Sequence, residues 1–249
     1  MSENKWRSVF VSDVHLGTRG SDASGLYEFL KNNTSDNTYL VGDFFDIWKM
    51  STGIYWQPIY NELLSHLIKK RKNCIYITGN HDEYFRKFSP IELAGFRLVD
   101  ECVHTCANGK QYLVIHGDRF DGVTRYAKWL AILGSHGYNI LIALNSTLNW
   151  FRKKLGMKYW SLSAAVKKRV KEAVSFISNF ETALVHECNS RGYDGIICGH
   201  IHQPDIKTIQ DILYLNTGDW VESSTAIVET HEGEFLLLDK EGRPWKRKG

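Results

Sequence analysis

The sequence has few of the features that would divide it into parts or place it in a membrane. Its 249 residues include only four prolines, and no stretch rich in proline, glycine and serine interrupts the chain. It shows no internal repeats and no low-complexity segments, which argues against a repeat architecture or a long linker. It also lacks a run of about 20 apolar residues, which a membrane-spanning helix would need. We therefore expect one domain over residues 1–249.

The cysteine pattern and the N-terminus both favour a cytoplasmic protein. The five cysteines are odd in number and include no C-x-x-C pair, which argues against a disulfide framework and favours a reducing compartment. Residues 1–6 lack the apolar segment of a signal peptide. The formal net charge is only +3 and no nucleic-acid-binding motif is recognisable, so we expect no nucleic-acid partner.

Short apolar runs alternate with amphipathic segments along the first part of the chain. Helices are predicted at residues 23–30 and 60–71, and Asn108-Gly109 predicts a hairpin turn. The basic tail, residues 243–249, is expected to be loose. Two sheets with helices outside them fit this order, which indicates an α/β fold. Strands are predicted at residues 9–11, 39–41, 74–78, 112–115, 195–198, 206–209, 212–216, 225–228 and 235–238.

Polar residues follow five of these apolar runs. Loops at strand ends often carry chemistry, because a rigid sheet positions them. Residues i and i+2 of an extended segment point the same way, so Asp13 can face the same point as His15, and His200 the same point as His202. The five stretches are Asp13-Val14-His15, Gly42-Asp43-Phe44-Phe45-Asp46, Gly79-Asn80-His81-Asp82, His116-Gly117-Asp118 and Gly199-His200-Ile201-His202.

The side chains in these stretches suit divalent metal ions. Carboxylates, imidazoles and an amide oxygen are ligands for Mn²⁺, Fe²⁺ or Zn²⁺, and the absence of a grouped thiolate argues against a structural zinc or an iron–sulfur cluster. Two ions about 3.5–4 Å apart can clamp the attacking and leaving oxygens of a phosphoryl transfer. Seven candidates exceed the need of one ion and suffice for two that share a carboxylate: Asp13, His15, Asp43, Asn80, His116, His200 and His202.

Each stretch has a simpler explanation when it is considered alone. Gly79-Asn80 is ordinary turn chemistry, a single D-x-H is often a capped turn, and Asp46 suits the N-cap of a helix. A shared metal site has the advantage of explaining all five stretches together. The remaining histidines lack this context and are expected to be structural or solvated: His66, His104, His136, His186 and His231.

In order and spacing, the five stretches resemble the sequence blocks of the calcineurin-like metallophosphoesterases. The resemblance spans nearly the whole chain and implies a four-layer αββα sandwich with two metals at the strand ends. It further implies that His81 contacts the phosphoryl oxygen or the leaving group and is oriented by Asp82. The implied ligands of the first metal are Asp13, His15, Asp43 and His202. The implied ligands of the second are Asp43, Asn80, His116 and His200, with Asp43 as the bridge.

A narrower resemblance links the chain to the bacterial UDP-2,3-diacylglucosamine pyrophosphatases and their paralogues. It rests on residues 42–48, 116–118, 159–163 and 216–223. Those enzymes release UMP and 2,3-diacylglucosamine 1-phosphate during lipid A synthesis. They carry Gly-Asn-Arg-Asp in the third block, whereas this chain has His81 in place of the arginine. This difference aligns the chain with a paralogous branch and with the broader phosphoesterase family.

Residues 123–191 resemble the helical cap of the pyrophosphatases. Their many apolar side chains would pack on one another or on the core, or would form an acyl-chain groove or a membrane contact. The basic run 152–154 and residues 167–171 suit an anionic inner-membrane surface, and a solvated helix face is the alternative. The candidate substrate-binding residues, including arginines that flank the metal stretches, are Arg86, Arg119, Arg125, Tyr159 and Trp160.

The sequence therefore predicts a metal-dependent phosphoesterase or pyrophosphatase with two divalent ions. We expect Mn²⁺, with Fe²⁺, Zn²⁺ and Mg²⁺ as alternatives. The expected substrate is UDP-2,3-diacylglucosamine or a similar lipid-linked diphosphate, and the location is cytoplasmic or peripheral on the inner membrane. Two alternatives are a generic phosphodiesterase or nucleotide phosphohydrolase of the same fold, and a non-catalytic, metal-dependent scaffold.

Overall fold

The computed structural model describes residues 5–69, 73–93, 96–120, 149, 152, 154–158 and 162–246, with the backbone alone over 162–174. The chain divides into two units, 1–120 with 183–246 and 121–182 with 247–249. Residues 123–148 of the expected cap, among them Arg125, lie outside the described residues, and so do Tyr159 and Trp160. Among the described helices, none is long and apolar enough to cross a membrane.

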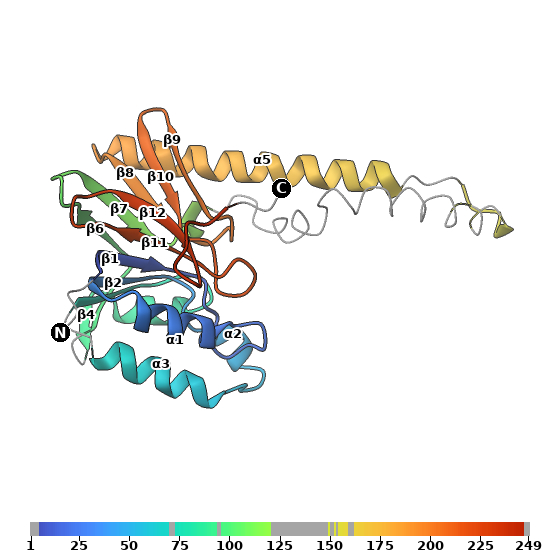
Figure 1. Cartoon of the computed structure of the whole chain (residues 1–249). Coiled ribbons are helices and arrows are strands. Elements are labelled where there is room, and N and C mark those ends of the chain that lie inside the picture. The colour runs from blue at the N-terminus through green and yellow to red at the C-terminus, as the bar shows by residue number, and fades with distance from the viewer. Residues whose placement is uncertain are drawn as a thin grey trace. The chain divides into compact units, whose positions relative to one another are not determined.

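The first unit contains a mixed sheet of seven strands in the order β12-β11-β1-β2-β3-β5-β4 (Figure 1). The central strands β1, β2, β3 and β5 run parallel to one another, so their carboxyl ends point to the same edge of the sheet. The strands are β1 (Trp6–Val11), β2 (Ser35–Val41), β3 (Cys74–Ile77), β4 (Ile91–Leu93), β5 (Phe96–Val99), β11 (Thr225–Glu229) and β12 (Phe235–Asp239).

A second sheet of five strands has the order β6-β7-β8-β10-β9. In it β7, β8 and β10 are parallel. The predicted turn at Asn108-Gly109 is confirmed, because it joins the antiparallel strands β6 and β7. The strands are β6 (Glu101–Thr105), β7 (Gln111–Ile115), β8 (Gly195–Cys198), β9 (Asp205–Ile209) and β10 (Ile212–Asn216).

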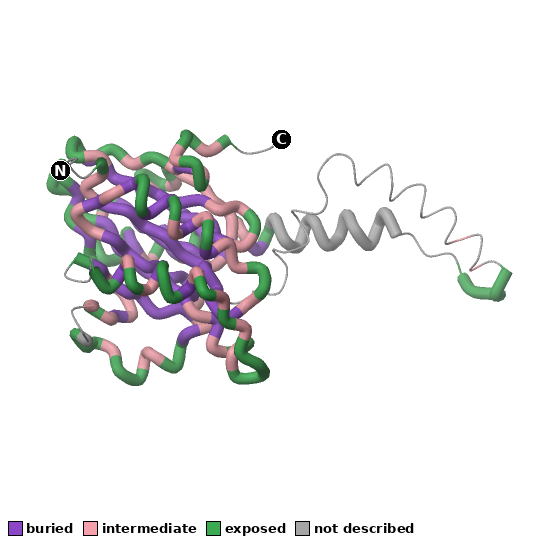
Figure 2. The backbone as a smooth tube through the Cα atoms, turned by 60° about the horizontal axis from the view of Figure 1, so that its bottom comes forward, coloured by how far each residue is buried: buried purple, intermediate pink, exposed green. Residues whose placement is uncertain are grey.

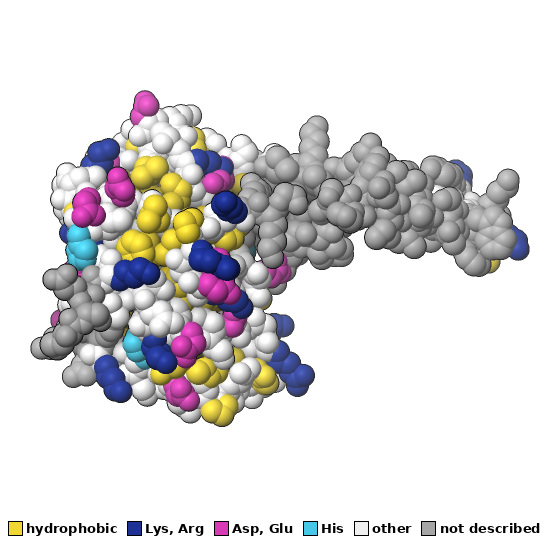
Figure 3. Space-filling model, in the orientation of Figure 1, with side chains coloured by type: hydrophobic (Ala, Val, Ile, Leu, Met, Phe, Trp, Pro, Cys, Tyr) yellow, Lys and Arg dark blue, Asp and Glu magenta, His cyan; other side chains and the backbone are white. Residues whose placement is uncertain are grey.

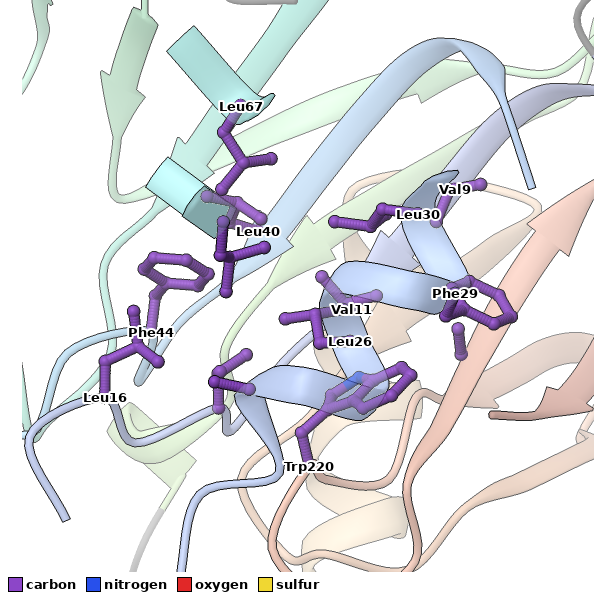
Figure 4. Close-up of a cluster of buried hydrophobic side chains, with 14 of the residues drawn as sticks. Val9, Val11, Leu16, Leu26, Phe29, Leu30, Leu40, Phe44, Leu67 and Trp220 are labelled. Carbon is purple, nitrogen blue, oxygen red and sulfur yellow. The ribbon is translucent and has the colours of Figure 1, made fainter. Parts of the chain in front are cut away.

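Helices cover the outer faces of both sheets, so the layers run helix, sheet, sheet, helix, as predicted (Figure 1). Against the larger sheet, Leu26 and Phe29 of α1 pack with Val9, Val11 and Leu40 (Figure 4). On the smaller sheet, Leu184, Val185 and Cys188 of α5 are buried. The helices are α1 (Ala23–Asn32), α2 (Ile47–Met50), α3 (Pro58–Lys69) and α5 (Leu162–Ser190), with the 3₁₀ helices η2 (Glu83–Phe88) and η3 (Asp118–Phe120).

The two sheets pack face to face through a second apolar cluster. Phe10 and Val41 come from the larger sheet, and Val114, Ile197 and Leu215 come from the smaller one. Figure 2 shows the central strands as buried along most of their length. Strands that are covered on both faces must be apolar throughout, which is why continuous apolar runs predicted them.

One buried ionic group joins the two sheets at their interface. Glu229 is fully buried, and its carboxylate lies 2.6 Å from Nη1 of Arg7 and 2.8 Å from Nε2 of His104. The backbone N–H of Ala107 donates to Glu229 at 2.9 Å, and Tyr39 Oη lies 2.9 Å from the other ring nitrogen of His104. His104 is therefore structural, as predicted. Buried charge is tolerated here because every oxygen of the carboxylate has a donor.

The C-terminal tail differs from its prediction. Residues 243–245 are held rather than loose. Trp245 donates its backbone N–H to the carbonyl oxygen of Leu237 at 2.9 Å, and Pro244 forms an antiparallel β-bridge with Leu238. Arg243 lies 2.8 Å from Asp239. Basic composition suggested a solvated end, but these contacts attach residues 243–245 along the outer edge of β12.

Candidate metal centre

Parallel strands bring all five predicted stretches to one region of the molecule. Loops 12–16 and 42–46 follow β1 and β2, loop 78–82 follows β3, and loops 116–118 and 199–202 follow β7 and β8. Backbone hydrogen bonds join neighbouring loops, with His15 N donating to Asp43 O at 2.9 Å and Gly199 N donating to His116 O at 3.2 Å. The sheet topology therefore explains why residues from both halves of the chain converge.

Several of the predicted ligands have left-handed backbones. The φ angles are 53° at Asp13, 51° at His15, 52° at Asp43, 72° at His200 and 53° at His202. Non-glycine residues seldom adopt positive φ, and such strain gathers at functional sites. The chain thus holds five side chains in costly conformations that turn them toward a common point.

Two glycines leave room for the carboxylates. A Cβ atom at Gly79 would overlap Oδ1 of Asp43, and one at Gly199 would overlap Oδ2 of Asp13 and Oγ of Ser12. Any side chain at either glycine would displace the neighbouring acid. Gly79 and Gly199 are therefore required by the close approach of these side chains.

Asp13, His15 and His202 form the first group of potential ligands. Their ligand atoms lie within 4.8 Å of one another. Nε2 of His202 is 3.2 Å from Oδ1 of Asp13, and Nε2 of His15 is 3.8 Å from the same oxygen. The other oxygen of Asp13 accepts hydrogen bonds from Ser12 Oγ and from the backbone N–H of His200. Asp13 is thereby held with one oxygen directed at the two imidazoles.

Asp43, His116 and His200 form a second group with the same close spacing. Nε2 of His116 is 3.3 Å from Oδ2 of Asp43 and 3.3 Å from Nδ1 of His200. Nδ1 of His116 lies 2.9 Å from the carbonyl oxygen of Val41. A carbonyl can only accept, so Nδ1 carries the hydrogen and Nε2 is left to bind a cation. Asp43 also lies with His15 and His81 in a third such group, so it stands between the others.

Buried atoms at this centre that lack hydrogen-bond partners among the described residues include Nδ1 of His81, which lies beside Asp46, and three atoms of other side chains: Oδ1 of Asp13, Nε2 of His15 and Oδ1 of Asn80. Buried polar atoms are nearly always paired, so each such atom calls for an explanation. All three belong to the predicted ligands, and all offer a lone pair. A divalent cation would satisfy them.

The charges at the centre also favour a cation. Burial lowers the pKa of His202, but the charge of Asp13 outweighs it and raises the pKa to about 9. Burial likewise opposes protonation of His116, whose pKa is nevertheless raised well above its usual value by Asp43. The pKa of Asp43 is lowered because the charge of His116 outweighs burial. The carboxylates thus attract protons to the imidazoles, and a metal ion would displace those protons.

Comparison with known proteins agrees with this geometry. The profile of the family described as "Calcineurin-like phosphoesterase" matches residues 7–204, which include all five stretches. The chain belongs to the calcineurin-like phosphoesterases. It is therefore a metal-dependent hydrolase, and the family implies divalent metal ions, for which the three groups described above are candidate sites.

Relatives named UDP-2,3-diacylglucosamine hydrolase match this phosphoesterase over most of its length. The protein of that name from Psychromonas ingrahamii is 26% identical over 242 residues, covering 93% of this chain and 96% of its own. That of Aliivibrio fischeri is 25% identical, with 91% and 98% covered. Among solved structures, an archaeal phosphodiesterase is 13% identical with a TM-score of 0.47, covering 93% of this chain and 98% of its own.

The contacts of His81 in this phosphoesterase differ from the sequence expectation. Nδ1 of His81 lies 3.1 Å from Oδ1 of Asp46, and the ring also faces the indole of Trp48 at a centroid distance of 4.4 Å. The other oxygen of Asp46 lies 3.3 Å from Nδ1 of His15. Burial would raise the pKa of Asp46, but the hydrogen bonds of His15 and His81 outweigh it and lower the pKa. Asp46 is therefore ionised between two imidazoles, in addition to capping α2 through Lys49 N.

Asp82 does not orient His81 as the resemblance implied. Its carboxylate is fully buried and accepts from the backbone N–H of Phe44 at 2.9 Å, from the backbone N–H of Gly79 at 2.6 Å and from Tyr76 Oη. At the start of a 3₁₀ turn its side chain points inward, away from its sequence neighbour. Its contacts instead tie the loop that carries Asp43 to the loop that carries Asn80.

The two described arginines expected to bind substrate are both paired with carboxylates. Nη2 of Arg86 lies 2.8 Å from Oδ1 of Asp118, and the side chain also donates to Thr78. Arg119 lies 2.9 Å from Asp100 and is nearly half exposed. Arg86 thus joins loop 78–82 to loop 116–118, and a phosphate would have to compete with Asp118 for it. Phosphate binding by either arginine remains a prediction.

Proposed function

We propose that the protein hydrolyses UDP-2,3-diacylglucosamine, or a similar lipid-linked diphosphate, with the help of two divalent ions. The family supports phosphoester hydrolysis, and the names of the relatives support this class of substrate. Such a substrate resides in a membrane, which agrees with the expected peripheral location.

The unpartnered atoms at the centre carry the proposal. Oδ1 of Asp13 and Nε2 of His15 belong to one group of potential ligands, whereas Oδ1 of Asn80 lies in the loop beside Asp43. One ion would be held by Asp13, His15, Asp43 and His202, and the other by Asp43, Asn80, His116 and His200. When bound, two such ions supply a Lewis acid for the phosphoryl oxygens and activate the attacking water.

The chain's own residues would supply the remaining chemistry. The pKa of His81 is raised: burial opposes its charge, but the hydrogen bond to Asp46 and the charge of Asp43 outweigh burial. A protonated imidazole beside the metal ligands can stabilise a phosphoryl oxygen or give its proton to the leaving group. Asp46 would hold the ring and its proton in place. Trp48, which is about half exposed at 49%, would limit the movement of the ring from outside.

A second candidate substrate class is favoured by His81 itself. The characterised pyrophosphatases that the sequence resembles carry arginine at this position, and arginine binds phosphate bidentately without transferring a proton. An imidazole held by a carboxylate suits a leaving group that needs a proton. A generic phosphodiester or nucleotide is therefore the alternative substrate, and a scaffold that only binds metal is the non-enzymatic alternative.

Release of UMP from UDP-2,3-diacylglucosamine tests the proposal. We expect Mn²⁺-dependent release by the wild type and none by Asp43→Asn, with about two ions per wild-type chain by metal analysis. Turnover of bis-p-nitrophenyl phosphate without turnover of the lipid would support the generic alternative. Full metal content without turnover of either compound would support the scaffold. A chain that binds no ion, or an Asp43→Asn variant as active as the wild type, would contradict the two-metal site.

A further inference from the structure

The segment made of the last residue of β10 and the loop that follows it, residues 216–224, lies beside the metal centre although it supplies none of the predicted ligands. β10 is parallel to β8, with Asn216 opposite Cys198, so the two strands end at the same edge. The loop after β8 carries His200 and His202. The loop after β10 is therefore a sixth loop at the place where the other five converge.

Side chains and backbone of this sixth loop support two of the five stretches. Asn216 Nδ2 donates to the carbonyl oxygen of Gly199 at 2.9 Å. Thr217 Oγ1 lies 2.6 Å from Ser12 Oγ, the hydroxyl that donates to Asp13. Trp220 donates its backbone N–H to the carbonyl oxygen of Asp13 at 3.0 Å. All of these contacts act on the first and fifth stretches, which carry Asp13 and His202.

Trp220 anchors the loop in the hydrophobic core. Its side chain is fully buried and lies 5.5 Å from the ring of Phe29, measured between ring centroids. Figure 4 shows the indole among the side chains of α1, close to Leu26 and Phe29. The loop is thus fixed by packing and has little freedom to move relative to Asp13.

Asp219 stands at the centre of the loop and is fully buried. Its Oδ1 accepts from the backbone N–H groups of Val221 at 2.8 Å and of Glu222. Its Oδ2 accepts from Ser223 Oγ at 2.9 Å and lies 3.8 Å from Nδ1 of His202. The turn alone could be capped by one oxygen, whereas the second oxygen faces an imidazole whose Nε2 is directed at Asp13.

We propose that Asp219 is a positioning residue for the ion held by Asp13 and His202. The inference rests on the proposed two-metal site. His15 and His116 show the same arrangement, with Nδ1 near an oxygen of Asp46 or Val41 and Nε2 near a carboxylate of the centre. A histidine that binds metal through Nε2 needs an acceptor at Nδ1, and such partners orient the ring and raise its basicity. Asp219 occupies the corresponding place beside Nδ1 of His202, at a longer distance of 3.8 Å.

Calorimetric titration of the metal-free protein with Mn²⁺ tests the proposal without measuring activity. In Asp219→Asn the turn keeps an oxygen acceptor, but the charge beside His202 is lost. We expect one of the two binding events to weaken by about 10- to 100-fold, the range seen when such partners are removed. The other event should keep its wild-type affinity, because the contacts described for the Asp219 carboxylate lie within its own loop and at His202.

Two variants separate positioning from a merely structural effect. Ser223→Ala removes a partner of Asp219 and leaves its charge in place, so Mn²⁺ affinity should remain at the wild-type value. Asp239→Asn alters a carboxylate that also caps a turn, through Glu241 N and Arg243 N, far along the chain from the ligands. It should likewise leave metal binding unchanged.

The outcomes distinguish this inference from the proposed function. A wild type that binds two ions, with Asp219→Asn binding both as tightly, would overturn the role of Asp219 alone. Equal weakening by Ser223→Ala and Asp219→Asn would also overturn it, because the effect would then be that of a disturbed turn. A wild type that binds no Mn²⁺ would overturn the two-metal site and this inference with it.

Discussion

Nδ1 of His81 lies 3.1 Å from Oδ1 of Asp46, although the two residues belong to loops that follow different strands. The neighbouring oxygen of the same carboxylate lies 3.3 Å from Nδ1 of His15. A single acid thus contacts His15, an expected metal ligand, and His81, which is absent from the two ligand sets that the family resemblance implies but lies in the third close group with Asp43. Because Asp46 contacts both histidines, a variant at Asp46 should lose metal affinity as well as activity, whereas a variant at His81 should lose activity only.

Replacement of His81 by alanine should leave metal binding intact and remove most of the activity. His81 touches the centre through Asp46 and by an edge contact with His15, so no ligand is lost. We expect kcat to fall by about 10²- to 10⁴-fold, the usual contribution of a general acid or base. Metal analysis beside steady-state kinetics checks this. Loss of an ion from His81→Ala would instead make His81 a ligand.

Asp46→Asn should reduce both activity and metal affinity. The variant keeps an oxygen for the N-cap of α2 but presents an amide to one of the two imidazoles. The part of the activity that Asp46→Asn loses through His81 should not add to the loss in His81→Ala, because the effects of substitutions in residues that act as a unit are not additive. The double variant, compared with both single variants, measures this. Full additivity together with unchanged Mn²⁺ affinity would contradict a shared role.

Asp82→Ala should destabilise the protein more than it changes the chemistry of His81. The substitution leaves two buried backbone N–H groups and the hydroxyl of Tyr76 without their acceptor. Each unsatisfied donor costs about 1–3 kcal/mol, so a total on the order of 3 kcal/mol or more is expected. Urea unfolding of the metal-free protein measures it. Tyr76→Phe, which removes one partner only, should cost clearly less, and equal losses would argue against this account.

The stability of the fold should depend on Glu229 at acid pH. Burial would raise the pKa of this carboxyl, but the hydrogen bond from His104 leads a set of contacts that lowers it from 4.5 to about 2. A lowered pKa in the folded state gives stability that is fully present above pH 4.5 and is lost as pH falls toward 2. The shift corresponds to on the order of 3 kcal/mol.

Glu229→Gln tests this dependence. The variant should be less stable than the wild type at neutral pH, and its unfolding free energy should change less between pH 5 and about 2. Denaturant unfolding followed across that range supplies the comparison. Parallel pH profiles for the wild type and the variant would show that another group controls the acid sensitivity.

Much of the site could be predicted because its residues follow buried strands in short, regular stretches. Apolar runs at 9–11, 39–41 and 74–78 predicted strands, and the structure has them at Trp6–Val11, Ser35–Val41 and Cys74–Ile77. Parallel pairing then places the predicted residues close together, because it brings the strand ends to one edge of the sheet whatever their separation in the sequence. The family profile confirms the class of hydrolase that these stretches predicted.

The remaining contacts depend on side-chain directions that a sequence does not state. Asp82 is adjacent to His81 in the chain, yet it turns inward, and Asp46 from another loop takes its expected place. Arg86 was predicted to meet phosphate, but Asp118 lies within reach of it. Asp219 resembles an ordinary turn residue, and only the parallel pairing of β10 with β8 places it near His202. For Asp46, the one signal in the sequence was its position as the second acid of the stretch Gly42-Asp43-Phe44-Phe45-Asp46.

The hydrogen bonds between the first and fifth stretches have a consequence for the order in which the protein folds and binds metal. The backbone N–H of His200 donates to Asp13 across 187 residues of chain, and the sixth loop reaches Asp13 from still further along. Contacts so distant in sequence form late in folding, because the chain loses the conformational entropy of the long intervening segment before the contacts can stabilise it. A nascent chain that ends before β10 would hold all seven predicted ligands but would lack the sixth loop, which contacts Asp13 and His202. Tight metal uptake should therefore mark the last step of assembly, and a protein made in metal-poor cells should fold first and acquire its ions afterwards.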